Sequence, residues 1–157
     1  MSRVQLALNV SDLDEAIGFY ARLFGTGPAK VRPGYANFAV VDPPLKLVLI
    51  EDANRIPGSL NHLGVEVAST EEVAAAQARL AGGGLATAVL ERTTCCYALQ
   101  DKVWVTGPGG EPWEFYAVLA DAEMSAVCNC APLHEGSRPA APSAPPAAGV
   151  EMGSSCC

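Results

Sequence analysis

The chain has 157 residues, of which 50% are hydrophobic and 17% are charged, a composition typical of a globular protein. Its net charge of −7 argues against nucleic acid or an anionic membrane surface as a partner. No apolar run approaches the roughly 20 residues that a membrane-spanning helix needs, and the N-terminus lacks the apolar core of a signal peptide. We therefore expect a cytoplasmic protein.

A shift of 57 residues aligns the chain with itself, which indicates two similar halves over about 3–53 and 60–119. Each half opens with an alternating, strand-like segment and continues into a helical pattern. Each is therefore predicted to form a βαβββ module that cannot bury a sheet face alone, so the two modules should pack together. The predicted fold class is α+β, with paired βαβββ modules forming a concave cup. The shift superimposes two sets of apolar residues: Leu6, Leu8 and Val10 on Leu63, Val65 and Val67.

Both predicted helices carry start and stop signals. Asp12 with Glu15 resembles a capping box, and Ser69 with Glu72 opens the second helix in the same way. Glycines follow both helices, as is common at helix ends. Short strands are predicted after each helix, near residues 29–32, 36–41, 45–51, 86–92, 102–106 and 112–118.

The composition changes after the second half. From Cys128 onward the chain is rich in proline, alanine, serine and glycine, and no aromatic residue follows Tyr116. Such a segment cannot bury enough apolar surface to offset the entropy lost on ordering. We therefore predict a folded domain over 1–119 and a flexible, cysteine-containing tail over 120–157.

Residue alternation predicts which side chains face the concave side of the sheet. The apolar residues of each first strand should cover a helix, so Gln5 and His62 project to the opposite face at matching positions. In the last strand Glu114 lies between two aromatic residues and points the same way. The equivalent strand of the first half offers only Leu47. Three polar groups and one apolar group should therefore converge.

Gln5, His62 and Glu114 together suggest a metal site. Each residue alone is more typical of a polar strand residue, a hydrogen-bonded histidine or a rim carboxylate. Unpaired polar groups facing one cavity would be costly, so their convergence favours a shared ligand. A histidine, a carboxylate and one further donor with open positions form the facial arrangement that non-haem Fe(II) uses with O2.

The six cysteines occur in three close pairs. Adjacent cysteines rarely bond to each other, because the small ring strains both the disulfide and the peptide. In a reducing compartment Cys95 and Cys96 are instead placed to hold one soft atom, a metal or a metalloid; buried or incidental thiols are the alternative. The remaining cysteines either capture such an atom or are incidental: Cys128, Cys130, Cys156 and Cys157.

Residues 1–119 resemble the vicinal oxygen chelate superfamily, which includes glyoxalase I and the extradiol dioxygenases. The segment "GPGGEPWEFY" is similar to that family's turn and metal-binding strand, with Glu114 as the glutamate. The longer stretch "TTCCYALQDKVWVTGPGGEPWEFY" resembles the carbon–arsenic lyases and the related cadmium-induced proteins. This resemblance implies Fe(II)- and O2-dependent cleavage of the C–As bond of trivalent organoarsenicals to arsenite, with Cys95 and Cys96 binding the arsenic. Many relatives have histidine where Gln5 stands.

Two alternatives to this function stay open. The same fold with the same thiols would serve a binding protein that sequesters As(III) or Cd(II) without turnover. A glyoxalase-like metal enzyme is the second, although Leu47 at the fourth position counts against it. The partner expected is a small organoarsenical, with neither nucleic acid nor membrane, and pairing into a homodimer stays open. Candidate proton donors around the site are Tyr97, Lys102 and Tyr116.

Overall fold

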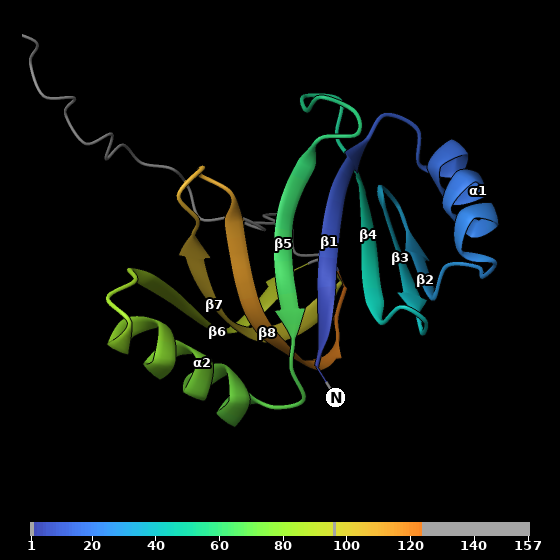
Figure 1. Cartoon of the computed structure of the whole chain (residues 1–157). Helices are drawn as coiled ribbons and strands as arrows, with labels where there is room; N and C mark the ends of the chain where they lie inside the picture. The colour runs from blue at the N-terminus through green and yellow to red at the C-terminus, as the bar shows by residue number, and fades with distance from the viewer. Residues whose placement is uncertain (1, 96, 124–157) are drawn as a thin grey trace, which may run out of the picture.

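The computed structural model describes residues 2–95 and 97–123. These residues form one eight-stranded mixed sheet with two helices (Figure 1). Cys96 and residues 124–157, with the four tail cysteines, lie outside the described residues, whereas residues 120 and 121 of the predicted tail belong to the last strand. The first module consists of β1 (Arg3–Val10), α1 (Leu13–Phe24), β2 (Lys30–Arg32), β3 (Tyr35–Val40) and β4 (Leu45–Glu51). The second consists of β5 (Leu60–Glu66), α2 (Thr70–Gly82), β6 (Thr87–Cys95), β7 (Ala98–Thr106) and β8 (Pro112–Asp121).

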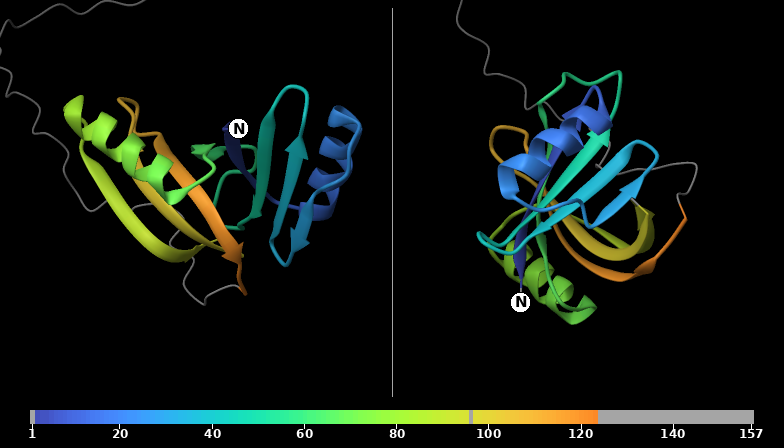
Figure 2. Two further views of the ribbon diagram at one scale, coloured as in Figure 1. Left: turned by 90° about the horizontal axis from the view of Figure 1, so that it is seen from below. Right: turned by 90° about the vertical axis from the view of Figure 1, so that its right-hand side faces the viewer.

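The two modules join edge to edge through their first strands. The strand order is β2-β3-β4-β1-β5-β8-β7-β6, with β1 antiparallel to β5 at the centre. In each module the first strand pairs in parallel with the last, β1 with β4 and β5 with β8. The sheet curls so that the halves splay apart and each carries its helix on the outer side (Figure 2). The predicted pair of βαβββ modules is confirmed.

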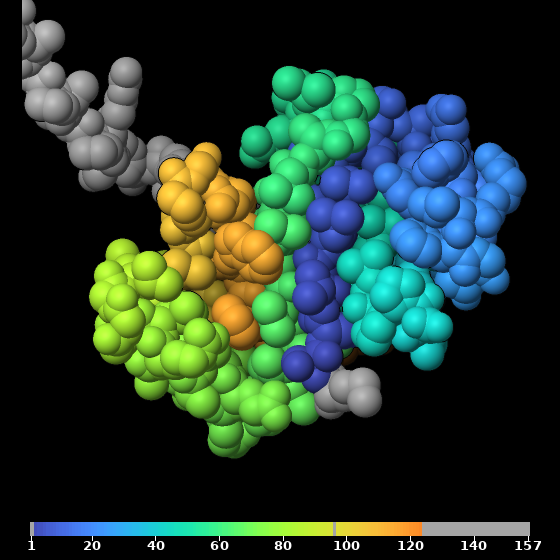
Figure 3. Space-filling model, viewed as in Figure 1, coloured from blue at the N-terminus to red at the C-terminus, as the bar shows by residue number. Residues whose placement is uncertain are grey.

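Each helix covers an apolar core on the convex side of its own module. Under α1 the largest buried side chains are Phe38, Leu47 and Leu49, each at most 1% exposed. Burying a side chain of this size contributes about 1.5–3 kcal/mol. Under α2 the core includes Val73 and Val103. The space-filling view shows α1 and α2 at opposite sides of the molecule, with β1 and β5 between them (Figure 3).

Both helices begin where the sequence predicts. The Asp12 carboxylate accepts a hydrogen bond from the Glu15 amide at 2.8 Å, and Ser69 accepts one from Glu72 at 3.4 Å. Gly25 ends α1 with φ +64°, a left-handed conformation that favours glycine. With 12 and 13 residues, neither helix in the described part is long and apolar enough to cross a membrane.

The second half of the sheet differs from the expected strand boundaries. β6 continues to Cys95 and β7 begins at Ala98, so both strands extend beyond the segments 86–92 and 102–106 that the sequence predicts. A bulge at Arg92, with φ +46°, interrupts the pairing, and its backbone N–H donates to Asp101 Oδ1 at 2.7 Å. Alternation is lost at a bulge, which is why the pattern predicted a break there.

Candidate functional site

Three polar side chains meet on the concave face at the junction of the modules. Gln5 on β1, His62 on β5 and Glu114 on β8 are buried, with 3–4% of each residue exposed. Gln5 pairs across the sheet with Gly64, and Gly64 pairs with Glu114, so the two polar residues flank a position that has no side chain. The structure brings together the three side chains that strand alternation places on one face of the sheet.

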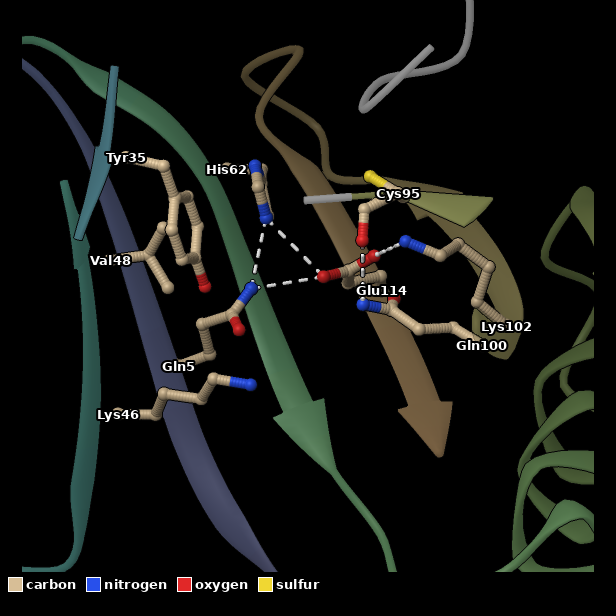
Figure 4. Close-up of a pocket in the computed structure, with 9 residues that line it drawn as sticks. All are labelled: Gln5, Tyr35, Lys46, Val48, His62, Cys95, Gln100, Lys102 and Glu114. Carbon is tan, nitrogen blue, oxygen red and sulfur yellow. Dashed lines mark hydrogen bonds and ion pairs between the residues drawn. The ribbon is translucent and has the colours of Figure 1, made fainter. Parts of the chain in front are cut away.

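The three side chains touch one another in a triangle (Figure 4). Gln5 Nε2 lies 2.9 Å from His62 Nε2 and donates to Glu114 Oε1 at 2.9 Å. His62 Nε2 lies 3.3 Å from Glu114 Oε1. One polar atom of each residue therefore points at a single common place.

A chain of amide side chains fixes the orientation of His62. The ring atom Nδ1 lies 2.7 Å from Asn61 Oδ1, which can only accept, so Nδ1 carries the proton. Asn61 in turn donates to Asn9 Oδ1 at 2.7 Å, and Asn9 donates to Ser59 Oγ at 2.9 Å. The lone pair of Nε2 is consequently directed toward Glu114, as in histidines that ligate metals.

Glu114 is an ionised carboxylate. Burial alone would raise its pKa, but the buried Lys102 cation holds the pKa of Glu114 well below its usual value. Lys102 Nζ donates to Glu114 Oε2 at 2.8 Å and is itself 2% exposed. One carboxylate oxygen is thus held by Lys102, and the other faces Gln5 and His62.

A second polar network lies behind Gln5. The Tyr116 hydroxyl lies 2.6 Å from Gln5 Oε1 and 2.9 Å from Glu66 Oε2. Burial would raise the pKa of Glu66, but Lys46 at 3.0 Å, with Arg3 and Tyr116, lowers it below its usual value. Burial, together with the nearby carboxylates, raises the pKa of Tyr116, so its hydroxyl stays protonated.

The chemistry of the cavity suits a divalent cation. His62 Nε2 and Glu114 Oε1 are both acceptors, and their lone pairs face each other across 3.3 Å. A cation between them would replace this repulsion with two bonds, and imidazole and carboxylate are ordinary ligands of Fe, Mn and Zn. Among the described residues no three His, Cys, Asp or Glu side chains form a metal cluster, and the third donor that lies beside His62 and Glu114 is the Gln5 amide.

Cys95 lines the same cavity as the three polar residues. It ends β6 and is 4% exposed, and its carbonyl accepts a hydrogen bond from Gln100 Nε2 at 3.2 Å. The structure therefore brings one of the two vicinal cysteines to the candidate site. Sequence analysis did not identify Gln100, because this residue lies outside the strand predicted near 102–106, whereas β7 begins at Ala98.

The other predicted residues are placed as follows. Lys102 and Tyr116 contact the site directly, through Glu114 and Gln5. Tyr97 does not line the cavity; its hydroxyl donates to the Pro33 carbonyl at 3.0 Å. The sequence predicted that Leu47 would face the cavity, and this prediction was wrong by one residue.

Leu47 packs in the core under α1, while its neighbours Lys46 and Val48 face the cavity. Val48 pairs with Ala7 as Glu114 pairs with Gly64, so Val48 is the true counterpart of the glutamate. The fourth position is apolar, as predicted, but a different residue fills it. Lys46 was missed, although strict alternation along 45–51 would have found it.

Comparison with known proteins adds independent findings. The model of the Glyoxalase/Bleomycin resistance protein/Dioxygenase superfamily matches residues 3–115. A trivalent organoarsenical cleaving enzyme of Thermomonospora curvata is 56% identical over 161 residues, covering 100% of both chains. The cadmium-induced protein CadI of Mycobacterium tuberculosis is 66% identical over 123 residues, covering 78% of this chain and 80% of that protein.

Among solved structures, an extradiol ring-cleaving dioxygenase from B. fuscum is similar with a TM-score of 0.55 and 22% identity. The similarity covers 77% of this chain and 34% of that one. At this level of identity the match shows a shared fold and no more.

Proposed function

Because this chain belongs to the glyoxalase, bleomycin resistance protein and dioxygenase superfamily, we propose that Gln5, His62 and Glu114 hold one divalent metal ion. The support is the convergence of three buried polar atoms within 2.9–3.3 Å of one another. The set of one imidazole, one carboxylate and one amide leaves positions open, which favours Fe(II) as the metal and O2 as a co-substrate.

The proposed reaction is cleavage of the C–As bond of a trivalent organoarsenical, giving arsenite and an oxidised organic fragment. The observation that carries this proposal is the position of Cys95, which lines one cavity with the candidate metal ligands. Its vicinal partner Cys96 is adjacent in sequence, and two thiolates are the natural ligands of As(III). The relative from T. curvata that matches along the full chain is named for this activity.

Each group of this chain has a defined task in the proposed reaction. Cys95 and Cys96 bind the arsenic through two As–S bonds and so orient its carbon substituent toward the metal. Lys102 keeps Glu114 ionised, and Asn61 keeps the Nε2 lone pair of His62 directed into the cavity. When bound, Fe(II) would supply the one-electron chemistry that lets O2 react, while the four electrons that reduce O2 come from the carbon of the C–As bond, which leaves a methylarsenical as formaldehyde. Holding both reactants in one cavity supplies proximity.

The test distinguishes the role of the metal ligands from the role of the Cys95 thiol. Purified protein is given methylarsenite in air with and without Fe(II), and arsenite is quantified for the unmodified chain, His62→Ala and Cys95→Ser. We expect arsenite only from the unmodified chain with Fe(II), while Cys95→Ser keeps its Fe(II) and His62→Ala loses it.

Two results would contradict the proposal. Normal turnover by His62→Ala would remove this residue from the metal site. Tight arsenical binding with no arsenite under any condition would show a sequestering protein instead of an enzyme.

A further inference from the structure

The Tyr116 hydroxyl faces two acceptors with a single proton. Its oxygen lies 2.6 Å from Gln5 Oε1 and 2.9 Å from Glu66 Oε2. Glu66 is a carboxylate paired with Lys46 and Arg3, so it can only accept. A charged acceptor binds the proton more strongly than a neutral amide oxygen does. The Tyr116 hydroxyl therefore donates its hydrogen bond to Glu66. Its contact with Gln5 Oε1 then brings two oxygen acceptors together with no hydrogen between them.

The Gln5 amide has two ends, and only one of them can serve a cation. In the orientation described, Nε2 faces His62 and Glu114, and Oε1 faces Tyr116. The amide nitrogen has no lone pair to give to a metal, whereas the amide oxygen does. Rotating the amide by half a turn exchanges the two ends without moving the rest of the side chain.

With a cation bound between His62 and Glu114, the rotated amide leaves none of the surrounding polar groups without a partner. Nε2 would then donate to the Tyr116 oxygen, and the Tyr116 hydroxyl would donate to Glu66. Oε1 would face His62 Nε2 and Glu114 Oε1, completing a set of three acceptors around one point. We propose that Tyr116, held by Glu66, is a positioning residue that favours the Gln5 orientation in which the amide oxygen binds the metal. This inference rests on the metal site proposed above.

The test is metal affinity and not turnover. Titration calorimetry with Mn(II), and with Fe(II) under nitrogen, gives the Kd of the unmodified chain, of Tyr116→Phe and of Glu66→Gln. Tyr116→Phe keeps the buried ring and removes only the hydroxyl. One lost hydrogen bond predicts a Kd about 3- to 10-fold weaker for Tyr116→Phe, and Glu66→Gln should change Kd in the same direction. Tyr20→Phe, on α1 and away from the cavity, is the matched control and should change nothing.

The same substitution in the Gln5→His variant tests whether the effect of Tyr116→Phe on Kd depends on the Gln5 amide. In Gln5→His the ligand is an imidazole with no amide ends to exchange, so adding Tyr116→Phe should leave the Kd of Gln5→His unchanged. An unchanged Kd in Tyr116→Phe alone would overturn the inference, as would an equal loss in both backgrounds. An unmodified chain that binds neither metal would instead refute the metal site, and with it this inference. If Tyr116→Phe does not fold, Glu66→Gln in both backgrounds decides the same question.

Discussion

Gly64 forms the floor of the candidate site, and replacing it with alanine should disturb the metal ligands directly. A Cβ at this position would lie 3.1 Å from Glu114 Cγ and 3.3 Å from both Gln5 Cβ and Tyr116 Cε1. The strand conformation of Gly64 is open to any residue, so the only strain is steric. All three neighbours are buried and hydrogen-bonded, and none can move away freely.

The magnitude follows from two opposing effects. Overpacking a buried site costs about 1–3 kcal/mol, whereas replacing glycine by alanine recovers about 0.4–1 kcal/mol by restricting the unfolded chain. The free energy of unfolding should therefore fall by up to about 2.6 kcal/mol, with a central value of about 1.3 kcal/mol, which lowers the urea midpoint by roughly 0.6 M. Displacing Glu114 and Gln5 should also weaken metal binding about 10-fold or more.

Urea unfolding and metal titration on Gly64→Ala measure both effects. Gly27→Ala is the matched control, because a Cβ there meets no atom within 4 Å and Gly27 has no positive φ. Wild-type stability and wild-type metal affinity in Gly64→Ala would refute the packing described between β1, β5 and β8.

Three further predictions concern the carboxylate and the end of β8. Lys102→Met should lower the stability of the metal-free protein at pH 7 by about 3–5 kcal/mol, measured by urea unfolding, because Glu114 loses its buried cation. The folded pKa of Glu114 is lowered from 4.5 to about 2, so its ionised form contributes stability above pH 4.5 that is lost as the pH falls toward 2. Urea unfolding curves should therefore show a lower free energy of unfolding at pH 3 than at pH 5. Equal stability at the two pH values would contradict this role of Glu114. Truncation after Leu119 should destabilise the β6–β7 hairpin, because it removes Asp121, which pairs with Ala98. Truncation after Glu123 should keep metal affinity and activity. Equal thermal stability of the two truncated chains would count against this role of β8.

Strand alternation and the internal repeat were sufficient to find the three converging side chains. Both signals depend on regular geometry, since alternate residues of a strand face opposite sides and equivalent residues of two modules occupy equivalent places. Gln5 and His62 are 57 residues apart and touch at 2.9 Å. Because both residues lie on regular strands, alternation placed their side chains on the same face of the sheet.

The prediction failed where local geometry departs from that regularity. The bulge at Arg92 shifts the pairing of β6, so the hairpin that carries Cys95 and Gln100 did not show a strand pattern. The choice of Leu47 over Val48 came from an almost continuous apolar run in β4, where alternation gives little contrast. The two networks behind the site, from His62 to Asn9 and from Gln5 to Glu66, depend on tertiary contacts that no local pattern encodes.

Single-turnover release of arsenite tests the proposed function most directly. The protein is loaded with one Fe(II) per chain under nitrogen, mixed with one equivalent of methylarsenite, and then exposed to O2 while arsenite is quantified by mass spectrometry. If one cavity holds both the metal and the arsenical, about one arsenite per chain should form, and only after O2 is admitted. Arsenite that forms under nitrogen, or none that forms in O2 although metal and arsenical are both bound, would contradict an oxidative C–As cleavage at Gln5, His62 and Glu114.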